Sequence, residues 1–313
     1  MEIALQVFFF IGGLAVALFA SDRAVAYTRA LAAALGAPPF IVGVALVSIG
    51  TDLPELANSI AAHAQGEGDV NVGDSVGSTL TQYTFVLGLF PFIASTIAIE
   101  RRQVVLVSVF TAAGLGFTTF LVADGWLGRW DGTGLVLAWA VFTVAVVKGL
   151  PGQVADEPPA VRHESRLAQA GVVLVTLALV AFGATIAVRA LVHLAELAGA
   201  PEFLLAFFGA SMGTSAPEIV VDVTALLRGA PSIALGDALG SSLVDSTLSI
   251  GVGPLFFPAE VTPRLAVVGA LYSLVAVALV AVALAGRRRH DRASGILLFA
   301  LYGISYVVLL RAA

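Results

Sequence analysis

Two glutamates lie where a charge needs a compensating partner. Glu55 ends residues 50–55, which read Gly-Thr-Asp-Leu-Pro-Glu, and Glu218 ends residues 213–218, which read Gly-Thr-Ser-Ala-Pro-Glu. Both stretches lie inside long apolar segments. A charge at the centre of a bilayer costs roughly 3 kcal/mol, so it normally faces a partner, an ion or water. The proline before each glutamate removes a helix hydrogen bond and frees a carbonyl oxygen, which could serve as a further ligand.

These residue types favour a cation site over a buried ion pair. The apolar segments that carry the two glutamates contain no Lys or Arg, and the chain has no Cys. Two facing glutamates with oxygen ligands only are typical of a hard divalent ion such as calcium. The freed carbonyls would come from Thr51 and Thr214. The alternative for these threonines is a hydroxyl that bonds back to the preceding helical turn.

A second pair of stretches carries further polar groups. Residues 77–82 read Gly-Ser-Thr-Leu-Thr-Gln, and residues 240–245 read Gly-Ser-Ser-Leu-Val-Asp. Close helix packing alone would explain the glycines, but it does not explain Gln82 and Asp245 at matching depth. Asp52 is either one more carboxylate of the site or a group that faces water near a break in the segment.

The composition is that of a polytopic membrane protein. Of 313 residues, 59% are apolar and 12% are charged, with a mean hydropathy of +0.98, whereas soluble domains are about a quarter charged. The net charge of −5 and the lack of a basic stripe argue against a nucleic-acid partner. An intramembrane aspartyl protease would not need duplicated glutamates after prolines, and a channel fits an enclosed site poorly. We therefore expect no enzyme and no cofactor.

Apolar runs of about 20 residues predict ten membrane spans. They cover residues 3–35, 39–64, 70–96, 104–122, 133–150, 167–197, 201–227, 233–257, 265–285 and 294–310. A polar linker at residues 151–166 separates a first half, residues 1–150, from a second half, residues 167–313. The expected fold class is an all-α polytopic membrane protein of five spans plus five.

The two halves contain an internal repeat. With a shift of 163 residues, residues 36–91 align without a gap on residues 199–254, and glycines, prolines and the buried glutamates coincide. The matching spans are five apart in order, so they cross the membrane in opposite directions. Ten transmembrane helices would therefore form two inverted five-helix repeats, an architecture typical of secondary transporters with a site at the repeat interface.

Basic residues predict the orientation in a cell membrane. If the N-terminus is outside, 12 of the 16 Lys and Arg residues fall on the cytoplasmic side, including Arg287, Arg288 and Arg289. Both termini would then be extracellular and the linker at 151–166 would be cytoplasmic.

On these motifs the chain resembles the cation/calcium exchanger superfamily, and within it the prokaryotic sodium/calcium exchangers. The resemblance implies antiport of calcium for sodium by alternating access, with the first and sixth spans sliding against the rest. It implies that calcium is held by Glu55, Glu218, Thr51 and Thr214. It implies that sodium, or another coupling ion, is held by Ser48, Asp52, Ser78, Gln82, Ser211, Ser215, Ser241 and Asp245.

Two residues depart from the family pattern. Asp52 stands where the family usually has serine, and Gln82 stands where it usually has asparagine, or aspartate in potassium-dependent members. Asp52 adds a charge to one flanking site, where it could strengthen sodium binding or carry a proton in place of sodium. The sequence thus leaves two driving ions open: a calcium/sodium exchanger, or a proton exchanger for calcium or another divalent cation.

Overall fold

The structure is a computed structural model of the whole chain, and it describes residues 2–150, 165–197 and 213–312. By contacts the chain divides into two compact units, each built from segments on both sides of the linker. Unit 1 comprises Met1–Pro54 and Gly152–Asp237, and unit 2 comprises Glu55–Pro151 and Ala238–Ala313. Each unit is described by itself below.

Unit 1 is helical in its described residues. Its elements are α1 (Glu2–Leu35), α2 (Pro39–Val42), the π-helical turn η1 (Gly43–Val47), α3 (Ser48–Thr51), α9 (Arg166–Leu197) and α11 (Ala216–Leu227). Two further helices cross the division between the units: α4 (Leu53–Ala64) and α12 (Pro231–Val244). The structure thus places helices in the expected ranges 3–35, 39–64 and 167–197. Of the range 201–227, residues 201–212 lie outside the described residues.

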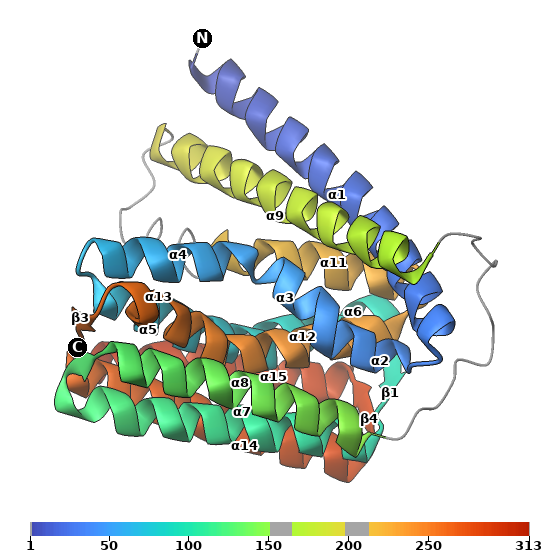
Figure 1. Cartoon of the computed structure of the whole chain (residues 1–313). Helices are drawn as coiled ribbons and strands as arrows, with labels where there is room; N and C mark the ends of the chain where they lie inside the picture. The colour runs from blue at the N-terminus through green and yellow to red at the C-terminus, as the bar shows by residue number, and fades with distance from the viewer. Residues whose placement is uncertain (1, 151–164, 198–212, 313) are drawn as a thin grey trace. The chain divides into compact units, whose positions relative to one another are not determined.

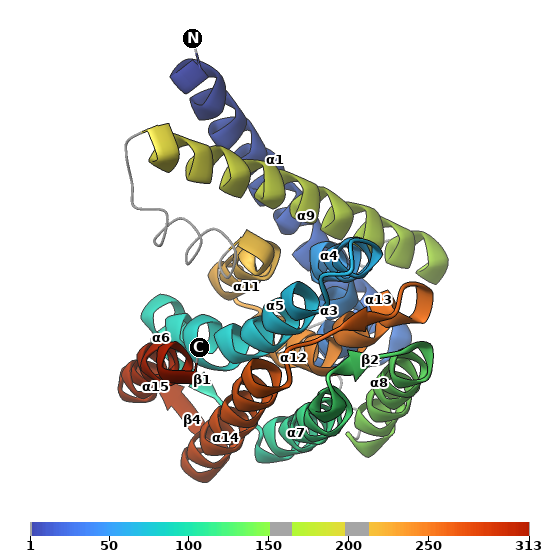
Figure 2. The same ribbon diagram turned by 90° about the vertical axis from the view of Figure 1, so that its left-hand side faces the viewer.

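The long helices α1 and α9 run side by side in both views (Figures 1 and 2). They cross at two glycines. A Cβ on Gly13 would lie 2.6 Å from the carbonyl oxygen of Gly183, and a Cβ on Gly183 would lie 2.6 Å from that of Gly13. Small residues let transmembrane helices approach this closely. Both helices carry exposed apolar side chains, such as Phe8 and Phe182 beside the crossing, as expected in lipid.

Unit 2 contains the remaining helices and the four strands of the residues that the structure describes. Its elements are α5 (Gly68–Thr81), η2 (Gln82–Val86), α6 (Leu87–Ala94), β1 (Thr96–Ala98), α7 (Arg101–Leu121), η3 (Val122–Asp124), β2 (Trp126–Leu127), α8 (Arg129–Gly149), η4 (Asp245–Ser249), α13 (Ile250–Phe256), β3 (Ala259–Glu260), α14 (Pro263–Arg287), β4 (Arg289–Asp291) and α15 (Arg292–Ala312). Its core lies where α14 packs on α5, α7 and α15.

The sequence did not predict the four strands, which form two antiparallel pairs. β1 pairs with β4, with Ile97 opposite His290, and β2 pairs with β3, with Leu127 opposite Ala259. Each strand has only two or three residues, too few for a period-2 pattern to be recognised. The pairs satisfy backbone N–H and C=O groups of the segments that connect the helices.

Six helices or continuous helix runs of the described residues are long and apolar enough to cross a membrane. They are Glu2–Leu35, Gly68–Ala94, Arg101–Asp124, Arg129–Gly149, Arg166–Leu194 and Pro263–Arg287. A seventh is counted if Pro39–Thr51 and Leu53–Ala64 form one broken span. The protein is therefore a helical membrane protein, as the composition predicted.

Candidate cation site

The helix breaks at the same place in both repeats. Asp52 separates α3 from α4 with φ −76° and ψ 7°, and its repeat mate Ser215 precedes α11 with φ −78° and ψ 5°. The following helix begins at once, so Pro54 and Pro217 lie in the first helical turn, where a missing N–H costs little. The prolines therefore start a new helix rather than kink a continuous one.

In unit 1 the break brings acidic groups together. Asp52 and Glu218 are fully buried, and each offers a carboxylate oxygen within 4.8 Å of the other. Residues 39–64 and 201–227, which carry them, contain no Lys or Arg. Two buried carboxylates at this distance repel each other unless a positive charge or a proton lies beside them.

The Thr51 hydroxyl has three oxygen neighbours in this unit. It lies 3.1 Å from the carbonyl of Ser48, 3.3 Å from that of Val47 and 3.3 Å from Oδ1 of Asp237. The Ser48 carbonyl also accepts the N–H of Asp52 at 3.0 Å. A hydroxyl has one proton to donate, so a turn toward Asp237 or Val47 would leave the Ser48 carbonyl one lone pair for a cation.

The predicted residues of unit 2 lie on α4, α5 and α12 and in two π-helical turns. Glu55 is buried in the first turn of α4, Ser78 is buried on α5, and Ser241 is buried on α12. η2 begins at Gln82 and η4 begins at Asp245, so the π-helical turns start at the two repeat mates that the sequence singled out. π-helical turns occur frequently at functional sites. Within unit 2, α5 packs against η4.

Three of the predicted ligands have buried oxygens that lack a hydrogen-bond partner within the described part of the chain. They are Ser78 Oγ, Gln82 Oε1 and Ser215 Oγ. A buried polar atom without a partner costs about 1–3 kcal/mol, so such atoms are rare unless they serve a ligand. Among the other candidates, Ser48 donates its hydroxyl to the Val44 carbonyl at 2.7 Å. Thr214 is half-buried, and Ser211 lies outside the described residues.

One buried acidic residue of unit 1 is not marked by the repeat. Asp222 lies one helical turn after Glu218 on α11, is fully buried, and lies within side-chain hydrogen-bonding range of Asp237. Two buried carboxyl groups in such contact need a shared proton or a cation between them. The repeat mate of Asp222 is Ser59, so the comparison of the halves did not mark this position. Its spacing of four residues from Glu218 was the signal in the sequence.

The first repeat satisfies the corresponding acid differently. Asp74, the mate of Asp237, accepts a hydrogen bond from the side-chain amide of Asn58 at 2.6 Å, and Ser59 accepts the N–H of Gly253 at 3.0 Å. An amide donates without any titrating proton. The acid–acid contact thus belongs to the second repeat among the described residues.

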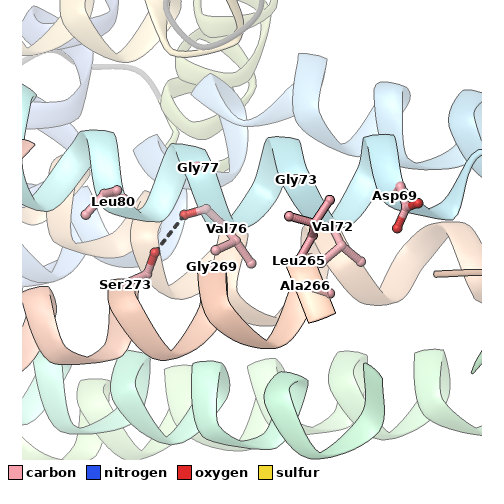
Figure 3. Close-up of a pocket in the computed structure, with 10 residues that line it drawn as sticks. All are labelled: Asp69, Val72, Gly73, Val76, Gly77, Leu80, Leu265, Ala266, Gly269 and Ser273. Carbon is pink, nitrogen blue, oxygen red and sulfur yellow. Dashed lines mark hydrogen bonds between the residues drawn. The ribbon is translucent and has the colours of Figure 1, made fainter. Parts of the chain in front are cut away.

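One cavity of unit 2 is lined by none of the predicted site residues. Figure 3 shows it between α5 and α14, where the Ser273 hydroxyl donates to the Val76 carbonyl at 3.4 Å. Its walls are apolar apart from Asp69 and Ser273, and Asp69 accepts hydrogen bonds from the N–H and the hydroxyl of Thr262. A cavity with so few polar groups does not suit a cation.

Helical membrane spans that carry buried carboxylates are typical of polytopic membrane proteins that bind or transport cations. The sequence profile described as Sodium/calcium exchanger protein matches residues 5–148 and 168–311. The chain belongs to the sodium/calcium exchanger family, a family of membrane transporters that exchange cations.

Individual relatives span nearly the whole chain. CaxA of Alkalimonas amylolytica is 29% identical over 315 residues, covering 96% of this chain and 97% of the relative. The sodium/calcium exchanger MaX1 of Methanosarcina acetivorans is 27% identical over 288 residues, covering 80% and 82%. A solved structure of the sodium-calcium exchanger NCX_Mj superposes with a TM-score of 0.81 at 25% identity, covering 97% of this chain and 99% of that one. This likeness confirms the predicted helical membrane fold, and the ten spans in two inverted repeats stay a prediction.

Proposed function

We propose that this protein moves calcium against sodium by alternating access. The observation that carries the proposal is the pair of fully buried carboxylates, Asp52 and Glu218, within 4.8 Å of each other in unit 1. Carboxylate, carbonyl and hydroxyl oxygens are the ligands that calcium and sodium prefer. A membrane antiporter of this family needs such groups at the depth where its ions exchange.

Calcium is held in this proposal by Glu55 and Glu218 with carbonyl oxygens of Thr51 and Thr214. The coupling ions bind around them at Ser48, Asp52, Ser78, Gln82, Ser211, Ser215, Ser241 and Asp245. One calcium ion or several sodium ions neutralise the same carboxylates, so the two cargoes compete. This competition couples the two fluxes, because an empty site keeps several uncompensated charges in the membrane.

The proposal includes the topology. Ten spans form two inverted halves, residues 1–150 and 167–313, around a cytoplasmic linker, with both termini outside. The chain has no cysteine, so a single cysteine introduced at Arg162 or at Ala313 reports its side directly. An impermeant thiol reagent should label Arg162→Cys only after the cells are opened, and Ala313→Cys in intact cells.

The test of the cargo uses purified protein in sealed vesicles. Calcium uptake should follow an outward sodium gradient and persist when the pH gradient is collapsed. Glu55→Gln and Glu218→Gln should each lower uptake by more than about 100-fold, since removing one partner of a buried charge interaction costs about 3 kcal/mol or more. Wild-type uptake in either variant would contradict the site assignment.

The second candidate is a proton exchanger for calcium or another divalent cation, favoured by one observation. Asp52 places a carboxylate where its repeat mate has only a serine hydroxyl. In that case uptake would follow an imposed pH gradient at constant sodium and would ignore the sodium gradient. The two gradients applied separately to the same vesicles distinguish the candidates.

A further inference from the structure

The strand pair β1–β4 gathers basic residues at one end of unit 2. β1 leads into α7, and β4 follows α14, so the pair joins the start of one long helix to the end of the other. The N–H of Ile99 donates to the Arg288 carbonyl at 3.0 Å. Arg101 and Arg102 therefore lie at the same end of the unit as Arg287, Arg288 and Arg289.

The charge of this end is positive. Arg287 and Arg289 both pair with Asp291, at 2.6 and 3.2 Å. Glu100 is the second acid here, and its side chain makes no capping hydrogen bond to α7. Five arginines against two acids leave a net charge of +3, and Arg101, Arg102 and Arg288 are exposed.

Arg288 adopts a backbone conformation that its side chain does not favour. It ends α14 with φ 52° and ψ 17°, in the left-handed region. Glycine is the usual residue at this position of a helix end because it has no Cβ. An arginine with this left-handed backbone is less favourable than a glycine would be. Residues with such unfavourable backbone conformations are frequent at functional positions.

A groove between α7 and α14 opens beside this basic end. Its apolar lining includes Val105 and Val109 from α7 and Ala278 and Val282 from α14, with Arg101 and Gly286 also lining it. Val109 is 56% exposed and Val282 is 73% exposed. The lining hydroxyl, Ser108, accepts a hydrogen bond from Tyr83 at 2.9 Å. Both helices are long and apolar enough to cross a membrane.

We propose that this groove binds an anionic phospholipid, with its phosphate on Arg101 and Arg288 and one acyl chain between α7 and α14. Guanidinium groups bind phosphate through two parallel hydrogen bonds. Basic clusters next to a transmembrane helix attract anionic lipids. The groove supplies apolar surface for the acyl chain. The arginines supply positive charge, which attracts a headgroup with a net negative charge more strongly than a zwitterionic one.

A second copy of this chain is a poorer occupant. A symmetric pair of copies would bury the same surface on both sides, so it would bring five arginines toward five others. Like charges facing each other disfavour such a contact. A phospholipid headgroup instead brings the opposite charge.

The experiment measures retained lipid by native mass spectrometry on purified protein in detergent, with phosphatidylglycerol and phosphatidylcholine added in equal amounts. Wild-type protein should retain phosphatidylglycerol preferentially. Arg101→Ala and Arg288→Gly should each lower this preference about fivefold. Arg288→Gly also suits the left-handed backbone, so it removes the charge without harming the fold.

Two further variants make the test specific. A Cβ on Gly286 would meet nothing within 4 Å, so Gly286→Leu should fold normally and fill the groove. It should abolish the preferential retention of phosphatidylglycerol, because the leucine side chain takes the space of the acyl chain. Arg264→Ala removes an exposed arginine from the first turn of α14, at its opposite end, and should leave retention unchanged.

Each of the following outcomes would contradict the proposal. Equal retention of the two lipids by wild-type protein would show that the arginines do not select an anionic headgroup. An equal loss in Arg264→Ala would indicate general surface attraction. Full retention in Gly286→Leu, or a dimer that this variant dissociates, would show that no acyl chain occupies the groove. None of these measurements depends on ion transport.

Discussion

The hydroxyl of Thr51 lies 3.3 Å from Oδ1 of Asp237, across 186 residues of sequence. The contact joins the Gly-Thr pair of the first repeat to Asp237 of the second repeat, inside unit 1. The same hydroxyl has the Ser48 and Val47 carbonyls as alternative acceptors. Asp237 therefore influences whether a backbone carbonyl beside the proposed site is free to hold a cation.

The first prediction concerns this acceptor. Asp237→Asn keeps an oxygen that accepts from Thr51, whereas Asp237→Ala removes it. We expect sodium-dependent calcium uptake to fall roughly fivefold further in the alanine variant than in the asparagine variant, since a hydrogen bond between uncharged groups is worth about 1 kcal/mol. Equal uptake in the two variants would show that the contact has no role in transport.

The second prediction concerns the acid–acid contact of Asp222 with Asp237. Asp222→Asn would replace it with an amide–carboxylate contact like that of Asn58 with Asp74. We expect a higher Tm in detergent, with a gain of about 1–3 kcal/mol. The reciprocal variant Asn58→Asp should lower the Tm. Unchanged Tm values in both variants would show that an acid–acid contact is no less stable here than an amide–carboxylate contact.

The third prediction concerns Asp52, which differs in type from its mate Ser215. Asp52→Ser removes one buried negative charge near Glu218 and should raise the sodium concentration for half-maximal calcium uptake roughly tenfold or more. Ser215→Asp, the reverse change in the second repeat, should lower it. If sodium dependence stays constant while pH dependence disappears in Asp52→Ser, the residue carries a proton instead.

The fourth prediction concerns His290, which lies in β4 between two helices and is fully buried. Its Nε2 donates to the Leu87 carbonyl at 2.6 Å, and Nδ1 lies 2.8 Å from the Ser294 hydroxyl. Burial lowers the pKa of this imidazole below 6.5, and the neighbouring Leu87 and Asp291 only partly oppose that effect. The folded protein therefore holds His290 neutral at pH 7.

The sign of the effect on stability follows from this pKa. The unfolded chain takes up the proton near pH 6.5 and the folded chain only at lower pH, so stability falls as the pH drops below 6.5. Thermal unfolding of wild-type protein between pH 7.5 and 5.5 should show this loss, and His290→Gln should reduce it. An equal pH dependence in the variant would assign the effect to other groups.

The sequence predicted the helices well because apolar length is a strong signal in a membrane protein. The expected range 265–285 lies within α14 (Pro263–Arg287), and the expected range 104–122 largely coincides with α7. The repeat also pointed to Gln82 and Asp245, where the π-helical turns begin. The turns themselves could not be predicted, since a π-helical turn depends on one extra residue in the hydrogen-bond ladder and has no pattern of its own.

The rest depends on contacts that the sequence does not contain. Asp237 meets Thr51 and Asp222 in the structure, contacts that no pattern in the sequence predicts. Asp222 was not noticed, because alignment of the halves placed it opposite a serine. The carboxylates of Asp52 and Glu218 lie within 4.8 Å only after α3 and α11 pack together in unit 1. How Glu55 completes the proposed ligand set stays a prediction.

The backbone contact at Gly13 and Gly183 has a mechanical consequence. No side chain separates α1 from α9 at this crossing, so no rotamer change can absorb a displacement of one helix. A displacement of either helix is therefore passed directly to the main chain of the other. Any swing of these two helices during a transport cycle would then be a joint movement. A cross-link between the two helices at this crossing should still allow the joint movement. A bulky residue at either glycine would separate the two helices.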